Sequence, residues 1–216
     1  GVVDLRAGLG GAETGGSMSL TAGAGTATST GSIVLKTVNA GTAGVSGGLS
    51  FRSGTTSAGS SGQIAFTSGA ATNGKGGDIS LAVGSGNTGI GGDISASAGS
   101  STAATGGSIS LSTGAGRDTS SGSVVVQTVN AGTSGVSGSL TFSTGTASDG
   151  TSGIISFQTG TATNGKGGDF SLVVGSGTDY SGGDLTMVAG ETTADSSLGG
   201  AVGITAGLGS STTGAS

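Results

Sequence analysis

The chain has 216 residues, 52 of them glycine, a net charge of -5, and no proline, cysteine or histidine. This composition excludes a disulfide framework, a metal centre built on cysteine or histidine, and collagen, which needs proline and a glycine at every third position. Six basic residues on an acidic chain do not supply a nucleic-acid-binding surface, and no apolar run approaches the roughly 20 residues of a membrane-spanning helix.

A short module of the form Gly-x-Φ-x-Φ-x-small, in which Φ is a large apolar residue, recurs along the whole chain. Successive modules start 15 residues apart, with steps of 16 after Gly31 and Gly122 and of 17 before the last. A longer period of 91 residues spans six modules, because Gly31–Ser46 returns as Gly122–Ser137. The fourteen modules open at Gly1, Gly16, Gly31, Gly47, Gly62, Gly77, Gly92, Gly107, Gly122, Gly138, Gly153, Gly168, Gly183 and Gly200.

Each module alternates apolar and polar residues and then ends in a small, polar segment. Positions 3 and 5 form two apolar columns, exemplified by Ile33 and Leu35, and an alternation of this kind is typical of a half-buried strand. Because every module repeats the same turn chemistry, we expect identical coils stacked about 4.8 Å apart. The prediction is an all-β fold, a single continuous β-solenoid over residues 1–216 with about 15 residues per coil, fourteen stacked coils and a six-coil super-repeat.

Several features have a local interpretation within such a repeat. Phe51 and Phe66 occupy the same column in adjacent modules and are predicted to stack in adjacent coils, as are Phe142 and Phe157 one block later. The segments TVNAG at 37–41 and 128–132 each add one residue and are interpreted as loop insertions. The string GSGNTG at 84–89 matches a dinucleotide-binding pattern without a following helix, and NGKG at 73–76 lacks the spacing of a phosphate loop, so both are interpreted as turns.

Four aspartates are the candidate metal ligands. Asp78 and Asp93 hold the same position in successive modules, as do Asp169 and Asp184. Stacked carboxylates repel each other and need compensation. Lys75 and Lys166 lie three residues before Asp78 and Asp169, which predicts local ion pairs; a calcium ion bridging each pair of aspartates is the alternative.

The polar positions of the modules are rich in hydroxyl groups, as in Ser108, Ser110 and Ser112. A flat face of hydroxyls is what ice-binding repeat proteins present, although valines such as Val125 interrupt it. The other interpretation is a solvated or laterally packed face. Tyr180 and the carboxylates form no cluster that departs from the repeat, so we expect no enzymatic activity and no cofactor beyond the alternative of calcium.

The strings GGDISLAVGSG, GSISLSTGAG and GSLTFSTGTASDGTSG resemble long Gly/Ser/Thr-rich repeat proteins of diatoms and related algae. The resemblance covers the whole chain and implies a secreted, extracellular structural protein of a fibre, cell wall or matrix. We therefore expect self-association into fibres, with a polysaccharide matrix as a further partner, and an ice- or surface-binding role as the alternative. Because the chain lacks an initiator Met and a terminal capping module, we also expect it to be part of a longer repetitive protein.

Overall fold

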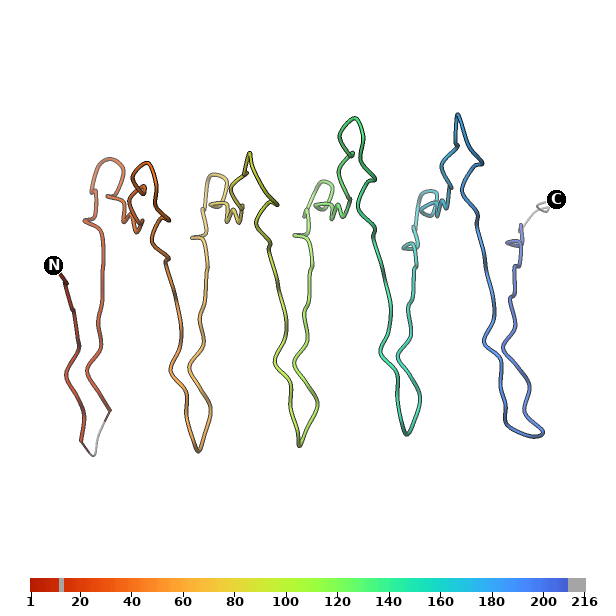
Figure 1. The fold of residues 1–216 in the computed structure, drawn as a ribbon, viewed down its shortest axis with the longest axis horizontal. Helices are drawn as coiled ribbons and strands as arrows, with labels where there is room; N and C mark the ends of the chain where they lie inside the picture. Colours follow the sequence, from red (N-terminus) through yellow and green to blue (C-terminus); the bar gives the residue numbers. More distant parts are fainter. Residues whose placement is uncertain (12–13, 210–216) are drawn as a thin grey trace. The chain divides into compact units, whose positions relative to one another are not determined.

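The computed structural model describes residues 1–11 and 14–209. Within these ranges the chain contains neither a helix nor a β-strand, and its backbone consists of extended limbs joined by sharp bends (Figure 1). The chain comprises two compact units, Gly1–Ile109 and Ser110–Ser216.

The sharp bends recur with the period of the sequence modules, one bend for each of the twelve modules between Gly16 and Gly199. In each case the chain runs outward, bends and returns, so that two antiparallel limbs form an arm. The bends of the first unit lie at 26–28, 42–43, 57–59, 72–74, 87–89 and 102–104. The bends of the second unit lie at 117–119, 133–134, 148–150, 163–165, 178–180 and 194–196.

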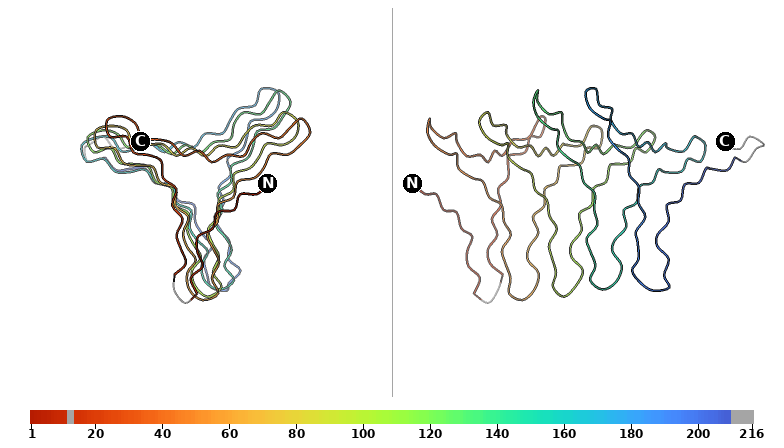
Figure 2. Two further views of the ribbon diagram at one scale, coloured as in Figure 1. Left: turned by 90° about the vertical axis from the view of Figure 1, so that its left-hand side faces the viewer. Right: turned by 45° about the vertical axis from the view of Figure 1, so that its right-hand side comes forward.

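Within each unit the arms leave a common middle in three directions (Figure 2). Arms that are three modules apart, such as those that end at 57–59 and at 102–104, point to the same side (Figure 1). One round of the backbone therefore takes three modules. The six-module period of the sequence equals two such rounds.

The predicted β-solenoid is wrong, because the described residues contain no β-strand. A solenoid coil of 15 residues would have to close on itself within one module. Each module between Gly16 and Gly199 instead contains one bend, which reverses the chain once and sends the next module along a different arm. Equivalent residues 15 positions apart consequently lie on different arms, and no ladder of hydrogen bonds connects them.

The two limbs of each arm meet at a contact between a glycine and a small residue, which we call the neck. In a neck, the opening glycine of one module lies beside position 7 of the preceding module, as Gly107 lies beside Ala98. A Cβ added to the opening glycine would lie 2.7 to 3.9 Å from the position 7 side chain in thirteen necks, from Gly16 to Gly200. The close approach explains why every module opens with glycine and carries Ala, Ser, Thr or Val at position 7.

A backbone hydrogen bond closes six of these arms at the neck. In the arm that ends at 26–28, Gly31 N donates to Gly23 O at 3.0 Å, which joins position 1 of one module to position 8 of the module before it. The other five bonds run from Gly16 to Gly8, Gly107 to Gly99, Gly122 to Gly114, Gly183 to Gly175 and Gly200 to Gly190. A single hydrogen bond at the neck is too few to make a sheet, so the two limbs of these arms stay extended without a ladder of hydrogen bonds between them.

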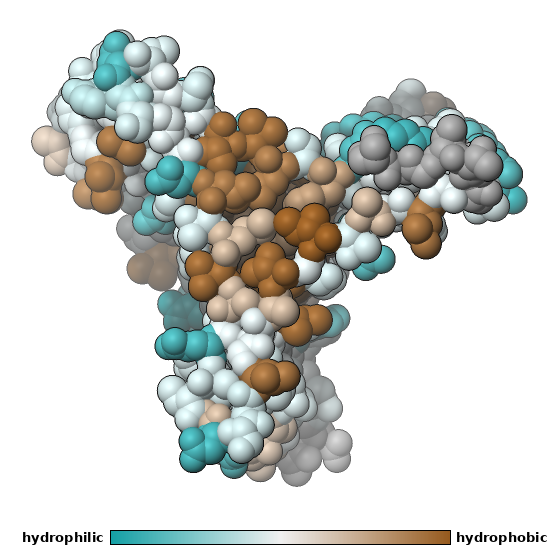
Figure 3. Space-filling model, turned by 90° about the vertical axis from the view of Figure 1, so that its right-hand side faces the viewer, coloured by the Kyte–Doolittle hydropathy of each residue, from teal (hydrophilic) through white to brown (hydrophobic). Residues whose placement is uncertain are grey.

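The apolar columns lie about halfway between successive bends, where the arms meet. On the face shown in Figure 3, hydrophobic side chains gather at this meeting point and hydrophilic ones toward the arm ends. The columns are partly shielded: Ile33 is 47% exposed and Ile64 is 49% exposed, whereas the loop residue Val45 is 98% exposed. No hydrophobic residue among those described is buried. The apolar columns and the other positions of the module therefore differ only in how much of each side chain is exposed.

Candidate functional site

Pairs of phenylalanines join neighbouring modules where the arms meet. The rings of Phe51 and Phe66 lie edge to face, with centroids 6.3 Å apart, and those of Phe142 and Phe157 repeat the arrangement at 6.0 Å. The two predicted pairs are in contact, but their rings meet edge to face and do not stack in the coils of a solenoid. Phe157 also contacts Phe170, which lies in the other apolar column, at 6.4 Å. Aromatic contacts therefore reinforce the apolar columns in both units.

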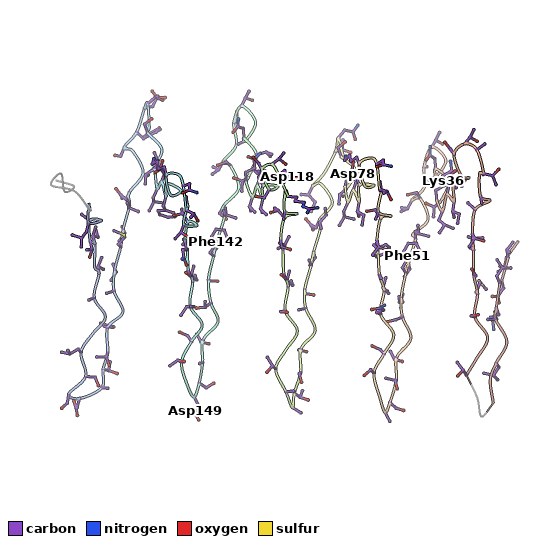
Figure 4. All side chains as sticks on the ribbon, turned by 180° about the vertical axis from the view of Figure 1, so that it is seen from behind. Lys36, Phe51, Asp78, Asp118, Phe142 and Asp149 are labelled. Atoms are coloured by element: carbon purple, nitrogen blue, oxygen red, sulfur yellow. The ribbon has the colours of Figure 1, made fainter. Side chains whose placement is uncertain are left out.

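The two lysines form the local ion pairs that the sequence predicts. Lys75 Nζ lies 2.7 Å from Asp78 Oδ2, and Lys166 Nζ lies 2.7 Å from Asp169 Oδ2. All four side chains are exposed to about three quarters of their surface, so water screens the attraction. Each pair links a bend to the limb that returns from it. Figure 4 shows Asp78 close to the bend of its arm, and the bend itself spans 72–74.

The remaining two candidate calcium ligands lie on the next arms. Asp93 follows the bend at 87–89, whereas Asp78 follows the bend at 72–74; Asp184 and Asp169 are separated in the same way. Neither Asp93 nor Asp184 forms an ion pair with any described residue. Over residues 1–11 and 14–209, no group of three or more acidic side chains is close enough together to hold a metal ion.

Sequence reasoning missed some polar contacts that stabilise individual limbs and bends. Arg6 pairs with Asp4 at 2.7 Å, on the same side of an extended limb. The alternation of side chains at a spacing of two was the signal that could have revealed this pair. At the bend at 102–104, Ser101 Oγ accepts a hydrogen bond from Ala104 N at 3.0 Å, as serine commonly does in turns.

The exposed apolar columns are the most extensive candidate site. Column residues such as Phe51 and Phe142 remain 54% and 60% exposed and lie on the limbs, whereas Asp149 lies at an arm end (Figure 4). No pocket forms in the part of the chain that the structure describes, and that part includes no helix able to cross a membrane. An exposed, regularly repeated apolar surface without a pocket suits contact with another macromolecule better than binding of a small molecule.

Comparison of the chain with known protein families, with curated proteins and with solved structures finds no match.

Proposed function

We propose that the protein is a non-catalytic structural component that associates with copies of itself. The single observation that carries the proposal is that the apolar columns stay exposed along both units, with none of the described hydrophobic residues buried. Apolar surface of this extent is removed from water in stable proteins. A lone chain offers too little burial to offset the entropy lost when its backbone is ordered.

The exposed area supports the same proposal quantitatively. The chain has a mass of 19.4 kDa and exposes 20990 Å². A compact folded protein of this mass exposes about 8,500 Å², and its fully unfolded chain about 28,000 Å². A standard protein–protein interface buries about 1,600 Å² in total, so the excess surface is sufficient for several interfaces on each chain.

The partner that fits this surface best is another copy of the chain. Apart from Ala96, every module carries a large apolar residue in both columns, so one copy presents to another a surface with the same spacing of side chains. Charged residues make up only 8% of the sequence, which keeps repulsion between copies small. The limbs also carry backbone N–H and C=O groups without backbone partners among the described residues, and such groups pair readily with another extended chain.

The proposed setting is an extracellular fibre, cell wall or matrix. Self-association can be measured directly on the purified protein. Sedimentation velocity over a range of concentrations, combined with electron microscopy, is expected to show growth from monomers into large assemblies. Replacing Phe142 and Phe157 by serine should shift this growth to higher concentration. The matched control replaces Val45 and Val136, which lie outside the columns and are 98% and 97% exposed.

Three outcomes of these measurements have different meanings. If the control variant assembles like the unmodified protein and the phenylalanine variant does not, the columns are the association surface. A protein that stays monomeric at every concentration would overturn the proposal. Equal effects of the two variants would show that association does not depend on the columns.

The second candidate function is binding to ice or to another ordered surface. Ser110 and Ser112 favour it, because both hydroxyl-bearing residues are exposed and lie two positions apart along one limb of the second unit. Thermal hysteresis of the purified protein tests this candidate. A freezing point equal to that of an inert protein at the same concentration would eliminate the ice-binding version.

A further inference from the structure

Two bends of the chain carry the dipeptide Asn-Gly, and self-association does not explain them. Asn73–Gly74 lies in the bend at 72–74, and Asn164–Gly165 lies in the bend at 163–165. These are the only Asn-Gly steps in the sequence, since Asn39 and Asn130 precede alanine and Asn87 precedes threonine. The chain therefore contains two sites and three internal comparisons of the same residue type.

The structure leaves both dipeptides open to reaction. Asn73 and Asn164 are exposed, and neither side chain forms a hydrogen bond with a described residue. The backbone N–H groups of Gly74 and Gly165 likewise make no backbone hydrogen bond within that part of the chain. A Cβ added to Gly74 would find only the Ala71 Cβ, at 4.0 Å, so the space around the bend is also unobstructed.

We propose that Asn73 and Asn164 are sites of spontaneous deamidation. Water or hydroxide takes the proton of the Gly74 N–H, and the nitrogen attacks Cγ of Asn73. The new C–N bond closes a five-membered succinimide ring while the bond from Cγ to Nδ2 breaks and ammonia leaves. Water then opens the ring at either carbonyl and leaves an aspartate or an isoaspartate. Glycine permits the required backbone rotation and has no side chain to obstruct the attack.

The reaction changes the charge of a bend that already contains an ion pair. A carboxylate at position 73 lies two residues before Lys75, whose ammonium is bound to Asp78 at 2.7 Å. The new group therefore competes with Asp78 for the same lysine. Modification of both sites lowers the net charge of the chain from -5 to -7. The two bends lie outside the necks, so the modification marks the arm ends and leaves the neck contacts intact.

The proposal does not rest on self-association and is tested on the full chain. The protein is kept in mildly alkaline buffer, and samples taken over time are digested and analysed by peptide mass spectrometry. We expect progressive loss of the amide at 73 and 164, with retention at 39, 87 and 130. Enzymatic methylation of isoaspartate should report new acceptor sites at the same two positions.

Two variants sharpen the test. Gly74→Ala should stop modification at 73 and leave 164 as an internal standard in the same molecule. Gly69→Ala is the control, because an added Cβ there meets nothing within 4 Å and the residue is not preceded by asparagine. Equal amide loss at all five asparagines would overturn the proposal, as would stable amides at both 73 and 164 or continued modification at 73 in Gly74→Ala.

Discussion

Gly92 lies against Val83 so closely that an added Cβ would be 2.7 Å from Val83 Cγ1. This is the tightest of the necks, and its counterpart between Gly183 and Val174 has a distance of 2.8 Å. In both necks position 7 holds valine, the bulkiest residue found at that position. Gly92→Ala should therefore destabilise the protein by about 1–3 kcal/mol, the usual cost of overpacking. Thermal melting followed by circular dichroism measures the effect.

A nearby glycine provides the control for this substitution. An added Cβ at Gly84 meets nothing within 4 Å, so Gly84→Ala should stabilise the protein by about 0.4–1 kcal/mol through the unfolded state. Adding Val83→Ala should restore the melting midpoint of Gly92→Ala, because the smaller side chain at position 83 makes room for one at position 92. If Gly92→Ala and Gly84→Ala shift the melting midpoint in the same direction, the neck does not constrain the opening glycine.

A second prediction concerns the loop of the arm that ends at 117–119. A Cβ on Gly116 would collide with the carbonyl oxygens of Ser120 and Thr119, whereas a Cβ on Gly114 meets nothing within 4 Å. A backbone atom cannot rotate away as a valine methyl can. Gly116→Ala should therefore cost about 3 kcal/mol, at the upper end of overpacking, and Gly114→Ala should be neutral or stabilising. Denaturant titration of both variants gives the comparison, and equal midpoints would contradict the loop geometry.

The period of the modules and the contacts between nearby residues could be predicted from the sequence. The Lys75–Asp78 pair follows from a spacing of three residues across a turn, and the contact between Phe51 and Phe66 follows from their shared column. The number of modules in one round could not be predicted. A repeat of 15 residues specifies where equivalent residues occur along the chain, but not whether one bend or three bends complete a round.

The role of the opening glycines was also beyond reach of the sequence alone. All fourteen are visible in the sequence as the residue type that opens each module. Their constraint is instead a contact between positions nine to eleven residues apart, such as Gly92 with Val83 and Gly200 with Ala189. Nothing in a single sequence pairs position 1 with position 7 of the preceding module. The apolar columns led to the wrong prediction of a solenoid for a related reason. Their alternation indicates that a limb has one apolar face, but it does not show what covers that face.

The third prediction measures the aromatic contacts directly. Phe157 contacts Phe142 edge to face and Phe170 in a tilted arrangement. A double-mutant cycle with Phe142→Leu and Phe157→Leu should give a coupling of about 0.5–1.5 kcal/mol, the part of an aromatic pair that exceeds its burial. The same cycle between Phe157 and Val136, a loop residue that is 97% exposed, should give no coupling beyond about 0.3–0.5 kcal/mol. A larger coupling in the second cycle would show that the coupling does not come from the contact between the rings.

The fourth prediction concerns the exposed ion pairs. Lys75 and Asp78 lie at 2.7 Å but are 77% and 74% exposed, so their attraction is worth about 0–1 kcal/mol. Lys75→Gln should shift the melting midpoint only slightly, and the shift should vanish at high salt, where exposed charges are screened. Lys166→Gln is the matched variant one block later and should behave in the same way. A loss of several degrees in either variant at high salt would show that the lysine does more than pair with its aspartate.

The last prediction distinguishes the two explanations of the paired aspartates. Lysine pairing accounts for Asp78 and Asp169, and calcium would have to join each of them to an aspartate on the next arm. Calcium takes six to eight oxygen ligands, so two carboxylates need several carbonyls or waters to complete a site. We therefore expect the melting midpoint to be the same in buffer, with EDTA and with excess calcium. A calcium-dependent rise that disappears in Asp93→Asn, but persists in Asp149→Asn at an arm end, would establish bridging of the arms by calcium and replace the ion-pair explanation.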